Sequence, residues 1–193
     1  KSTVPKREFI GLEVPPVFVG RTTDAANFEA TTAVDFNPQR DNEVAGLVLR
    51  RSERAYCELV VRRIDGQRSV AQRCVVGSLA REGTAVGIAE GPVTLRVRGF
   101  PSYYRFSYAL PDGRFREIGG VEAKPFASAD GRPNVTVGLY ASGNGVESSS
   151  VADFAWFDYD NAPKDPYADL VVTDSTLPPG YTIFSVIAAE KGI

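Results

Sequence analysis

The chain of 193 residues contains no histidine. This absence excludes Ser-His-Asp and Cys-His nucleophile systems, histidine-ligated zinc and imidazole acid–base chemistry. Only carboxylate, tyrosine, lysine or arginine chemistry remains. We therefore expect no complete active site on this chain and no required cofactor.

Charge of one sign is not in excess either, because 22 Lys and Arg residues face 24 Asp and Glu residues and the formal net charge is -2. The arginines are scattered instead of forming a basic run, so we expect no nucleic-acid partner. No apolar stretch approaches the roughly 18 to 20 residues that cross a bilayer, so we expect no membrane partner. The first residues lack the apolar core of a signal peptide. We expect a soluble chain whose export signal has been removed or which begins inside a longer polypeptide.

Helical periodicity is nearly absent, whereas apolar and polar residues alternate in many short segments. These segments are residues 28–36, 45–50, 55–63, 69–76, 93–98, 103–110, 115–119, 135–142 and 151–159. Turn formers such as Asn37-Pro38, Asp65-Gly66 and Gly91-Pro92 separate them. Hydrophobic residues make up 43% of the chain, enough for a folded core. The pattern predicts one all-β domain, an antiparallel two-sheet sandwich.

The clearest local signal is Asp65-Gly66, a two-residue loop that favours a type I′ hairpin turn. Partners across such a loop have numbers that sum to 131, which places Cys57 opposite Cys74. Counting outward from Ile64 and Gln67, this pair is non-hydrogen-bonded, where side chains approach most closely. The register predicts either a cross-strand disulfide or two buried free thiols. A disulfide would favour a secreted or periplasmic protein over a cytoplasmic one.

Changes in composition along the sequence predict three segments. Residues 1–17 are expected to be an N-terminal extension and residues 18–159 the sandwich. From Asp160 a polar stretch rich in Pro and Asp resembles a linker, followed by two apolar runs near the C-terminus. We expect residues 160–193 to be a linker and a tail that packs on the sandwich or on a partner.

Several separated motifs resemble a known family in their order. They are FVGR at 18–21, NFEATT at 27–32, DFNP at 35–38, NEVAGL at 42–47, VTLRV at 93–97, YRFSY at 104–108, VGLYASGNG at 137–145 and ADFAWFDY at 152–159. Together they are similar to the C-terminal concanavalin A-like domain of glycoside hydrolase family 43 enzymes, the group of β-xylosidases and α-arabinofuranosidases. The resemblance implies a jelly-roll sandwich that follows a five-bladed catalytic propeller, helps shape a sugar pocket and often takes part in homo-oligomer contacts.

Two departures from the family pattern alter what the resemblance implies. Thr22-Thr23-Asp24 follows Arg21 where the family commonly continues with an Arg-Gln-Gln-type run facing the propeller. Arg132-Pro133-Asn134 stands where the family commonly has a Phe-Thr-Gly loop that reaches toward the active site. An altered substrate or partner is therefore expected.

Candidate binding residues follow from the resemblance and from side-chain chemistry. Arg21 and Arg132 are expected at loops that face the sugar pocket or the partner domain, because guanidinium groups bind hydroxyl oxygens and carboxylates; ordinary surface arginines are the alternative. Tyr103 and Tyr104 point to opposite faces of one strand, so one is core and the other, Tyr103, is a sugar-contact candidate. Phe154 and Trp156 are predicted to fill the core.

Asp153 is a candidate ligand for a structural calcium ion, since related sandwiches can place an acidic residue there; a solvated carboxylate is the alternative. Three functions remain open. The first is a non-catalytic accessory sandwich of a family 43-like glycoside hydrolase acting on xylan- or arabinan-type polysaccharides. The second is an independent carbohydrate-binding module. The third, a hydrolase or lyase with its site on the sandwich, needs two convergent carboxylates or a Tyr and Arg pair in a cleft.

Overall fold

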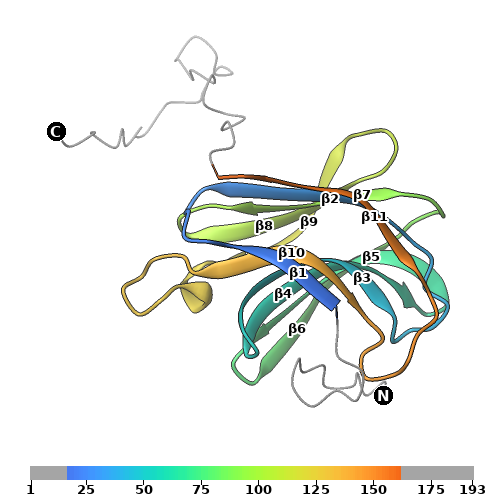
Figure 1. Cartoon of the computed structure of the whole chain (residues 1–193), viewed down its shortest axis with the longest axis horizontal. Coiled ribbons are helices and arrows are strands. Elements are labelled where there is room, and N and C mark those ends of the chain that lie inside the picture. Colours follow the sequence, from blue (N-terminus) through green and yellow to red (C-terminus); the bar gives the residue numbers. More distant parts are fainter. Residues whose placement is uncertain (1–16, 162–193) are drawn as a thin grey trace, which may run out of the picture. The chain divides into compact units, whose positions relative to one another are not determined.

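The computed structural model describes residues 17–161, which form two antiparallel β-sheets packed face to face (Figure 1). The six-stranded sheet has the order β1-β10-β3-β4-β5-β6. Its strands are β1 (Val17–Thr23), β10 (Val135–Ser142), β3 (Val44–Ser52), β4 (Ala55–Ile64), β5 (Gln67–Val76) and β6 (Leu79–Gly87). The five-stranded sheet has the order β11-β2-β7-β8-β9. Its strands are β11 (Ala152–Asp160), β2 (Phe28–Phe36), β7 (Val93–Gly99), β8 (Tyr103–Ala109) and β9 (Phe115–Glu122).

The main core lies between the two sheets and is built by alternation along each strand. In β2, Phe28, Ala30 and Val34 point inward and are buried. Leu47 and Leu59 face them from the six-stranded sheet. The all-β, two-sheet prediction is confirmed, and among residues 17–161 no helix is long and apolar enough to span a membrane. Asp160, where the predicted linker and tail of residues 160–193 begin, is the last residue of β11, and the rest of that segment from residue 162 lies outside the described residues, as does most of the predicted N-terminal extension.

The alternation predicted nine of the eleven strands that residues 17–161 form. Strands β2 and β10 have the predicted bounds. Strands β1 and β6 were missed, and both are edge strands of the six-stranded sheet. Strand β6 is almost entirely exposed, so its sequence needs no period-two pattern of apolar residues.

The hairpin of β4 and β5 has the register that its turn predicted. Ile64 pairs with Gln67 and Cys57 with Cys74. Asp65 and Gly66 both have positive φ, 49° and 79°, as a type I′ turn requires. The structure joins Cys57 and Cys74 by a disulfide, with Cα atoms 4.1 Å apart, on the inward face of the sheet.

The prediction that Trp156 fills the core is wrong. A β-bulge shifts the register between β11 and β2 from Phe154 to Trp156. The extra residue reverses which face the next side chains occupy. Phe154 before the bulge and Phe157 after it pack against the core, whereas Trp156 points outward and is 44% exposed.

Glu43 ties two loops together at one end of the sandwich. Its carboxylate accepts hydrogen bonds from the backbone N–H groups of Gln39, at 2.7 Å, and Arg40, at 3.1 Å. It also accepts hydrogen bonds from the hydroxyl groups of Ser148, at 2.7 Å, and Ser150, at 2.9 Å. Burial opposes ionisation of this group, but the four hydrogen bonds outweigh it and lower the pKa of Glu43 below its ordinary value.

Replacing Glu43 by Gln is expected to lower the free energy of unfolding at pH 7 by about 2 kcal/mol, because charge-assisted hydrogen bonds are lost. A depressed folded-state pKa contributes stability above the unfolded pKa of roughly 4.3, and this contribution disappears as the pH falls through the folded value. The difference between wild type and variant should therefore shrink below about pH 4. Urea unfolding at pH 7 and pH 3 measures it. The exposed Glu90→Gln variant is the control, and a difference that is the same at both pH values would contradict the assignment.

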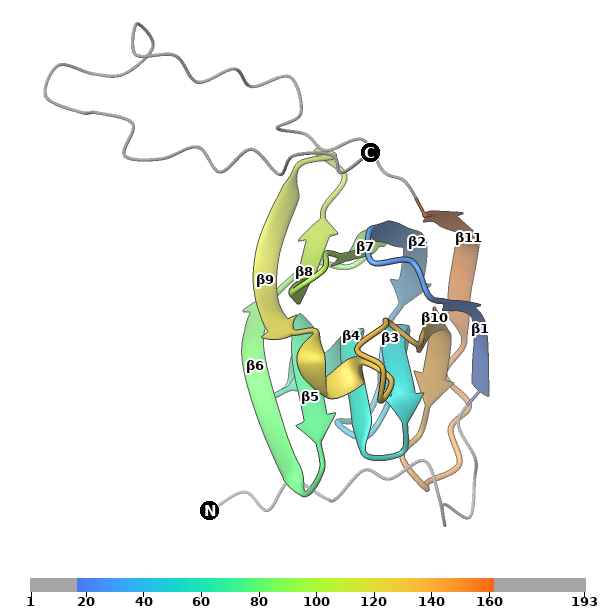
Figure 2. The ribbon, with the colours of Figure 1, turned by 90° about the vertical axis from the view of Figure 1, so that its left-hand side faces the viewer.

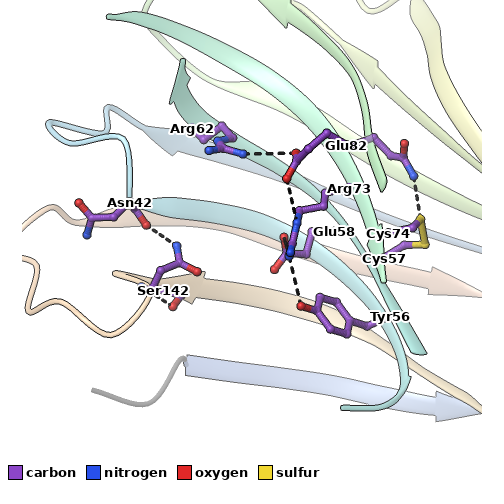
Figure 3. Close-up of polar contacts among 11 residues, drawn as sticks. Asn42, Tyr56, Cys57, Glu58, Arg62, Arg73, Cys74, Glu82 and Ser142 are labelled. Carbon is purple, nitrogen blue, oxygen red and sulfur yellow. Dashed lines mark hydrogen bonds and ion pairs between the residues drawn. A yellow bond between two sulfur atoms is a disulfide. The ribbon is translucent and has the colours of Figure 1, made fainter. Parts of the chain in front are cut away.

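The outward face of the six-stranded sheet carries a second apolar cluster and a chain of charged side chains. Val44, Val48, Tyr56, Val60 and Tyr140 form the cluster. The guanidinium of Arg73 lies 3.7 Å from Glu58 and 2.9 Å from Glu82, and donates a hydrogen bond to the Tyr56 hydroxyl (Figure 3). Arg62 reaches Glu82 at 3.6 Å. Burial alone would lower the pKa of Arg73, but the neighbouring Glu58, Tyr56 and Glu82 raise it.

Candidate functional site

A segment between β9 and β10 crosses from one sheet to the other and helps to form a cavity. Figure 2 looks onto this segment, which begins with the 3-10 helix Lys124–Phe126. Phe126 anchors it in the core, where its ring meets the ring of Tyr104 edge-on at 5.7 Å. The cavity measures about 560 Å³, a size that accommodates a small ligand.

The cavity is lined from three parts of the fold. The start of β8 contributes Tyr103 and Tyr104, the end of β9 contributes Glu122, and the crossing segment contributes Lys124 and Pro133. Strand pairing fixes part of this arrangement, since Tyr103 lies directly opposite Glu122. The lining thus combines aromatic rings, a carboxylate and an ammonium group, which suits a polar ligand with some apolar surface.

Tyr104 is the most constrained of the lining residues. Its side chain is 1% exposed, and within residues 17–161 its hydroxyl has no hydrogen-bond partner. Burial raises the pKa of Tyr104 to about 12, so the phenol keeps its proton at physiological pH. A buried hydroxyl without a partner costs free energy. Tyr104 thus lines the cavity, while its hydroxyl is itself enclosed.

Tyr103 lies on the opposite face of β8 from Tyr104, as alternation along the strand predicted. Its half-buried ring stacks on Phe100 with centroids 4.7 Å apart, and the guanidinium of Arg105 lies 5.0 Å from its centroid. Tyr103 is therefore fixed by an aromatic and a cationic neighbour at the rim of the cavity.

Arg132 is at the tip of the crossing segment, which closes on itself. Ala127 and Pro133 form a β-bridge, and the backbone N–H of Ser128 bonds to the carbonyl of Arg132 at 2.8 Å. The Arg132 side chain is 81% exposed and lies 3.7 Å from Asp130. Hydrogen bonds from Ser128 and from the backbone of Arg132 lower the pKa of Asp130. The two residues on either side of Arg132, Gly131 and Pro133, line the cavity, whereas Arg132 itself is not among the lining residues.

Arg21 does not occupy the loop position that was predicted for it. It is in the edge strand β1, paired with Val137, and its guanidinium lies 4.6 Å from the centroid of the Tyr159 ring. The prediction was wrong about its setting because the exposed edge strand β1 was not recognised in the sequence. Arg21 does not line the cavity, and of the three predicted binding residues Tyr103 is the one that does.

Asp153 lies on the exposed side of β11, opposite Asp35 of β2. Within the part of the chain that the structure describes, no three His, Cys, Asp or Glu side chains are grouped as metal ligands would be. Calcium needs six to eight oxygen ligands. The two opposed carboxylates alone do not provide a calcium site.

Carboxylates with shifted pKa values give little support for catalysis on the sandwich. Those of Glu43, Asp112 and Asp130 are lowered, the first by hydrogen bonds that outweigh burial and the other two chiefly by side-chain hydrogen bonds from Arg116 and Ser128. A general acid for glycoside hydrolysis needs a raised pKa. These three residues also lie in separate loops.

Glu122 and Lys124 line the cavity but were not predicted from the sequence. The pairing of β8 with β9 contains a bulge between Phe106 and Ser107, so the partner of Tyr103 could not be counted from the turn. Lys124 lies in the crossing segment, where alternation is absent. Only the adjacency of Tyr103 and Tyr104 gave a sequence signal for this site.

The fold and this site can be compared with known proteins. The family model described as the β-xylosidase C-terminal concanavalin A-like domain matches residues 7–160. A non-reducing end α-L-arabinofuranosidase of Bacteroides ovatus is 32% identical over 148 residues, covering 75% of this chain and 28% of the relative. A xylosidase/arabinosidase of Butyrivibrio fibrisolvens is 25% identical over 145 residues, covering 74% and 28%. The chain thus spans little more than a quarter of these curated relatives.

Solved structures of other proteins share the fold of this chain. The xyloglucan-locus GH43B protein of Bacteroides ovatus superimposes with a TM-score of 0.67 and 29% identity, over 74% of this chain and 29% of that chain. A functionally unknown protein from Saccharomyces cerevisiae has a TM-score of 0.63 and 15% identity, over 74% of this chain and 73% of that chain. The second likeness shows the fold alone, and it occurs in a chain that is mostly sandwich.

Proposed function

Since this chain belongs to the family of β-xylosidase C-terminal concanavalin A-like domains, we propose that it is a non-catalytic accessory sandwich of a family 43-like glycoside hydrolase. It would pack against a catalytic propeller domain or subunit and help to shape the pocket for xylan- or arabinan-type substrates. The observation that carries the proposal is the cavity lined by β8, β9 and the 124–134 segment, in which Arg132 stands between two lining residues.

Three features of the cavity support a sugar ligand. Aromatic rings suit the apolar faces of sugar rings, and Tyr103 supplies one at the rim. The Tyr104 phenol can donate to a sugar hydroxyl, and Glu122 can accept from one. The guanidinium of Arg132 is exposed and, apart from its contact with Asp130, can bind hydroxyl oxygens of a ligand that extends past Gly131 and Pro133.

Replacing Tyr104 by Phe tests the contribution of its hydroxyl to ligand binding without disrupting the fold. Because the hydroxyl makes no hydrogen bond within the described residues, the free energy of unfolding should stay unchanged or rise by about 1 kcal/mol. The affinity for xylose or arabinose oligosaccharides should fall about 5- to 10-fold, the loss of one hydrogen bond. Calorimetric titration measures the affinity. Tyr108→Phe, on the same strand but outside the cavity lining, is the matched control. Equal affinities of the two variants would show that the Tyr104 hydroxyl does not bind the ligand.

The accessory role is tested on the protein isolated from its source. Intact mass and size exclusion should reveal a propeller-sized extension or partner, and that species should hydrolyse aryl xylosides or arabinosides. The isolated 20.9 kDa chain should not hydrolyse them. An inactive native species of this mass alone would overturn the accessory role.

A stand-alone carbohydrate-binding module is the second candidate. It is favoured by the exposed aromatic rings on the outward face of the five-stranded sheet, Trp156 and Phe115, the latter with Arg96 3.6 Å above its ring centroid. This candidate requires that the chain binds a glycan by itself. Trp156→Ala should then abolish binding on a glycan array, whereas Tyr104→Phe should leave it unchanged.

We further propose a secreted or periplasmic location, supported by the Cys57–Cys74 disulfide, since such bonds persist in oxidising compartments. Alkylation of the unreduced native protein followed by mass measurement tests this. Incorporation of two alkyl groups without prior reduction would show free thiols and contradict the proposed location.

A further inference from the structure

Arg105 lies on the outward face of the five-stranded sheet, two residues after Tyr103 in β8. Side chains two residues apart in a strand point to the same face, and their Cα atoms are about 7 Å apart. Tyr103 is one of the residues that line the cavity. Arg105 is therefore the next residue on the outward face of β8 after a lining residue.

Two aromatic rings restrict the position of Arg105. Its guanidinium lies 5.0 Å from the ring centroid of Tyr103 and 5.7 Å from that of Phe100, and these two rings stack on each other. Aromatic rings attract a cation through their quadrupole, and a guanidinium has five N–H donors. The contact with the rings therefore holds the cation in place without providing carboxylate or carbonyl acceptors for these donors.

The hydrogen-bonding capacity of Arg105 is not used within residues 17–161. In this part of the chain its guanidinium donates no hydrogen bond, and its one ion pair is with Glu117 at 3.6 Å. Both side chains are exposed, 43% and 56%, and an exposed ion pair contributes little. Arg105 thus combines a restricted position with donors that a ligand can use.

A second guanidinium adds positive charge at the same place. Arg98 of β7 is directly opposite Arg105 of β8, and the two lie 5.8 and 5.7 Å from the centroid of the Phe100 ring. Like charges directly opposite each other in an antiparallel pair are unfavourable. Glu29 lies 2.8 Å from Arg98, but it belongs to β2, on the side of β7 away from Arg105. An anion bound at Arg105 would reduce the repulsion between the two arginines.

We propose that Arg105 binds the carboxylate of a uronic acid unit in the sugar chain that occupies the cavity, and that it thereby selects acidic over neutral sugar chains. The inference rests on the proposed sugar ligand of the cavity. A guanidinium matches a carboxylate with two parallel hydrogen bonds, and uronic acids are the sugars that carry a carboxylate. The ring of Tyr103, beside Arg105, suits the apolar face of a sugar unit.

Glu117 competes with such a ligand for Arg105. Its carboxylate lies 3.6 Å from the guanidinium and accepts no hydrogen bond from it, so a ligand carboxylate has to displace only a long, exposed ion pair. The two residues therefore have opposite expected effects. Loss of the arginine weakens the binding of an acidic sugar chain, whereas loss of the glutamate charge strengthens it.

Calorimetric titration of the full chain with a matched pair of ligands tests the proposal. One ligand is a xylo-oligosaccharide that carries a glucuronic acid substituent, and the other is the same molecule with its carboxyl group reduced to the alcohol. The wild type should bind the acid about fivefold more tightly, and this ratio of affinities should approach one in about 1 M salt. The formal net charge of the chain is -2, so general electrostatic attraction does not favour the acid.

Three variants identify the residue responsible. Arg105→Leu should reduce the ratio to about one, and Glu117→Gln should raise it about twofold. Arg114→Leu removes the same charge from the exposed turn at the other end of β8 and should leave the ratio unchanged.

Three outcomes would overturn the proposal. Equal binding of both ligands by the wild type would refute the selectivity for uronic acids and leave the sugar ligand of the cavity standing. Binding of neither ligand would refute the sugar ligand itself, and the selectivity with it. A ratio that persists in Arg105→Leu, or that Arg114→Leu lowers equally, would show that the acid is not bound by Arg105.

Discussion

Replacing Cys57 and Cys74 together by alanine is expected to lower the free energy of unfolding by about 3 kcal/mol. The disulfide closes a loop with a sequence separation of 17 residues, and cross-linking a loop of this length reduces the entropy of the unfolded chain by about that amount. Both side chains are buried on the inward face of the β4–β5 hairpin, so loss of their sulfur atoms also weakens packing. For a chain of this size the Tm should fall by about 6 to 12 °C.

Thermal unfolding with and without reductant separates the cross-link from packing. Reductant should lower the Tm of the wild type most of the way to that of the double variant, and should leave the double variant unchanged. A matched control is Val61→Ala with Val70→Ala, an opposed pair on the same hairpin without a cross-link. Its Tm should be insensitive to reductant. A wild type that is equally insensitive under unfolding conditions would show that the disulfide does not form in solution.

The central strands and the hairpin register were accessible from the sequence because each is determined by local chemistry. Alternation gave β2 because one of its faces is covered, and Asp65-Gly66 fixed the pairing of Cys57 with Cys74 because such a turn permits one register. A one-residue bulge cannot be predicted from the alternation of apolar and polar residues. It turned Trp156 outward although Phe154, two residues earlier, packs against the core.

The cavity was not accessible, because its residues come together only through the pairing of β8 with β9 and the crossing of the 124–134 segment. Arg132 was identified through a resemblance and Tyr103 through its neighbour, whereas the partnerless hydroxyl of Tyr104 required the packed structure. The burial of both faces of β3 does have a signal in the sequence. Residues 44–49 are VAGLVL, a continuous apolar run of the kind found in strands covered on both sides.

Replacing Arg73 by Leu should destabilise the domain by about 3 to 5 kcal/mol. The change removes the cation 3.7 Å from the fully buried carboxylate of Glu58 and 2.9 Å from Glu82 (Figure 3). Removing one member of a buried ion pair costs more than the pair contributes, because the remaining charge stays out of water. Arg105→Leu is the control, since its pair with Glu117 has side chains 43% and 56% exposed and should contribute less than about 1 kcal/mol.

The pH dependence and a double variant identify the cause. If the charge pair is the cause, the loss of stability should be largest at pH 7 and should diminish as the pH falls toward about 4, where carboxylates take up protons. Glu58→Leu combined with Arg73→Leu removes both charges and should recover most of the loss, since apolar replacements of buried ion pairs are often neutral or stabilising. Urea unfolding of the single and double variants at pH 7 and pH 4.5 measures both effects. If the double variant is as unstable as Arg73→Leu at both pH values, packing of the Arg73 stem and its contact with Tyr56 outweigh the charge pair.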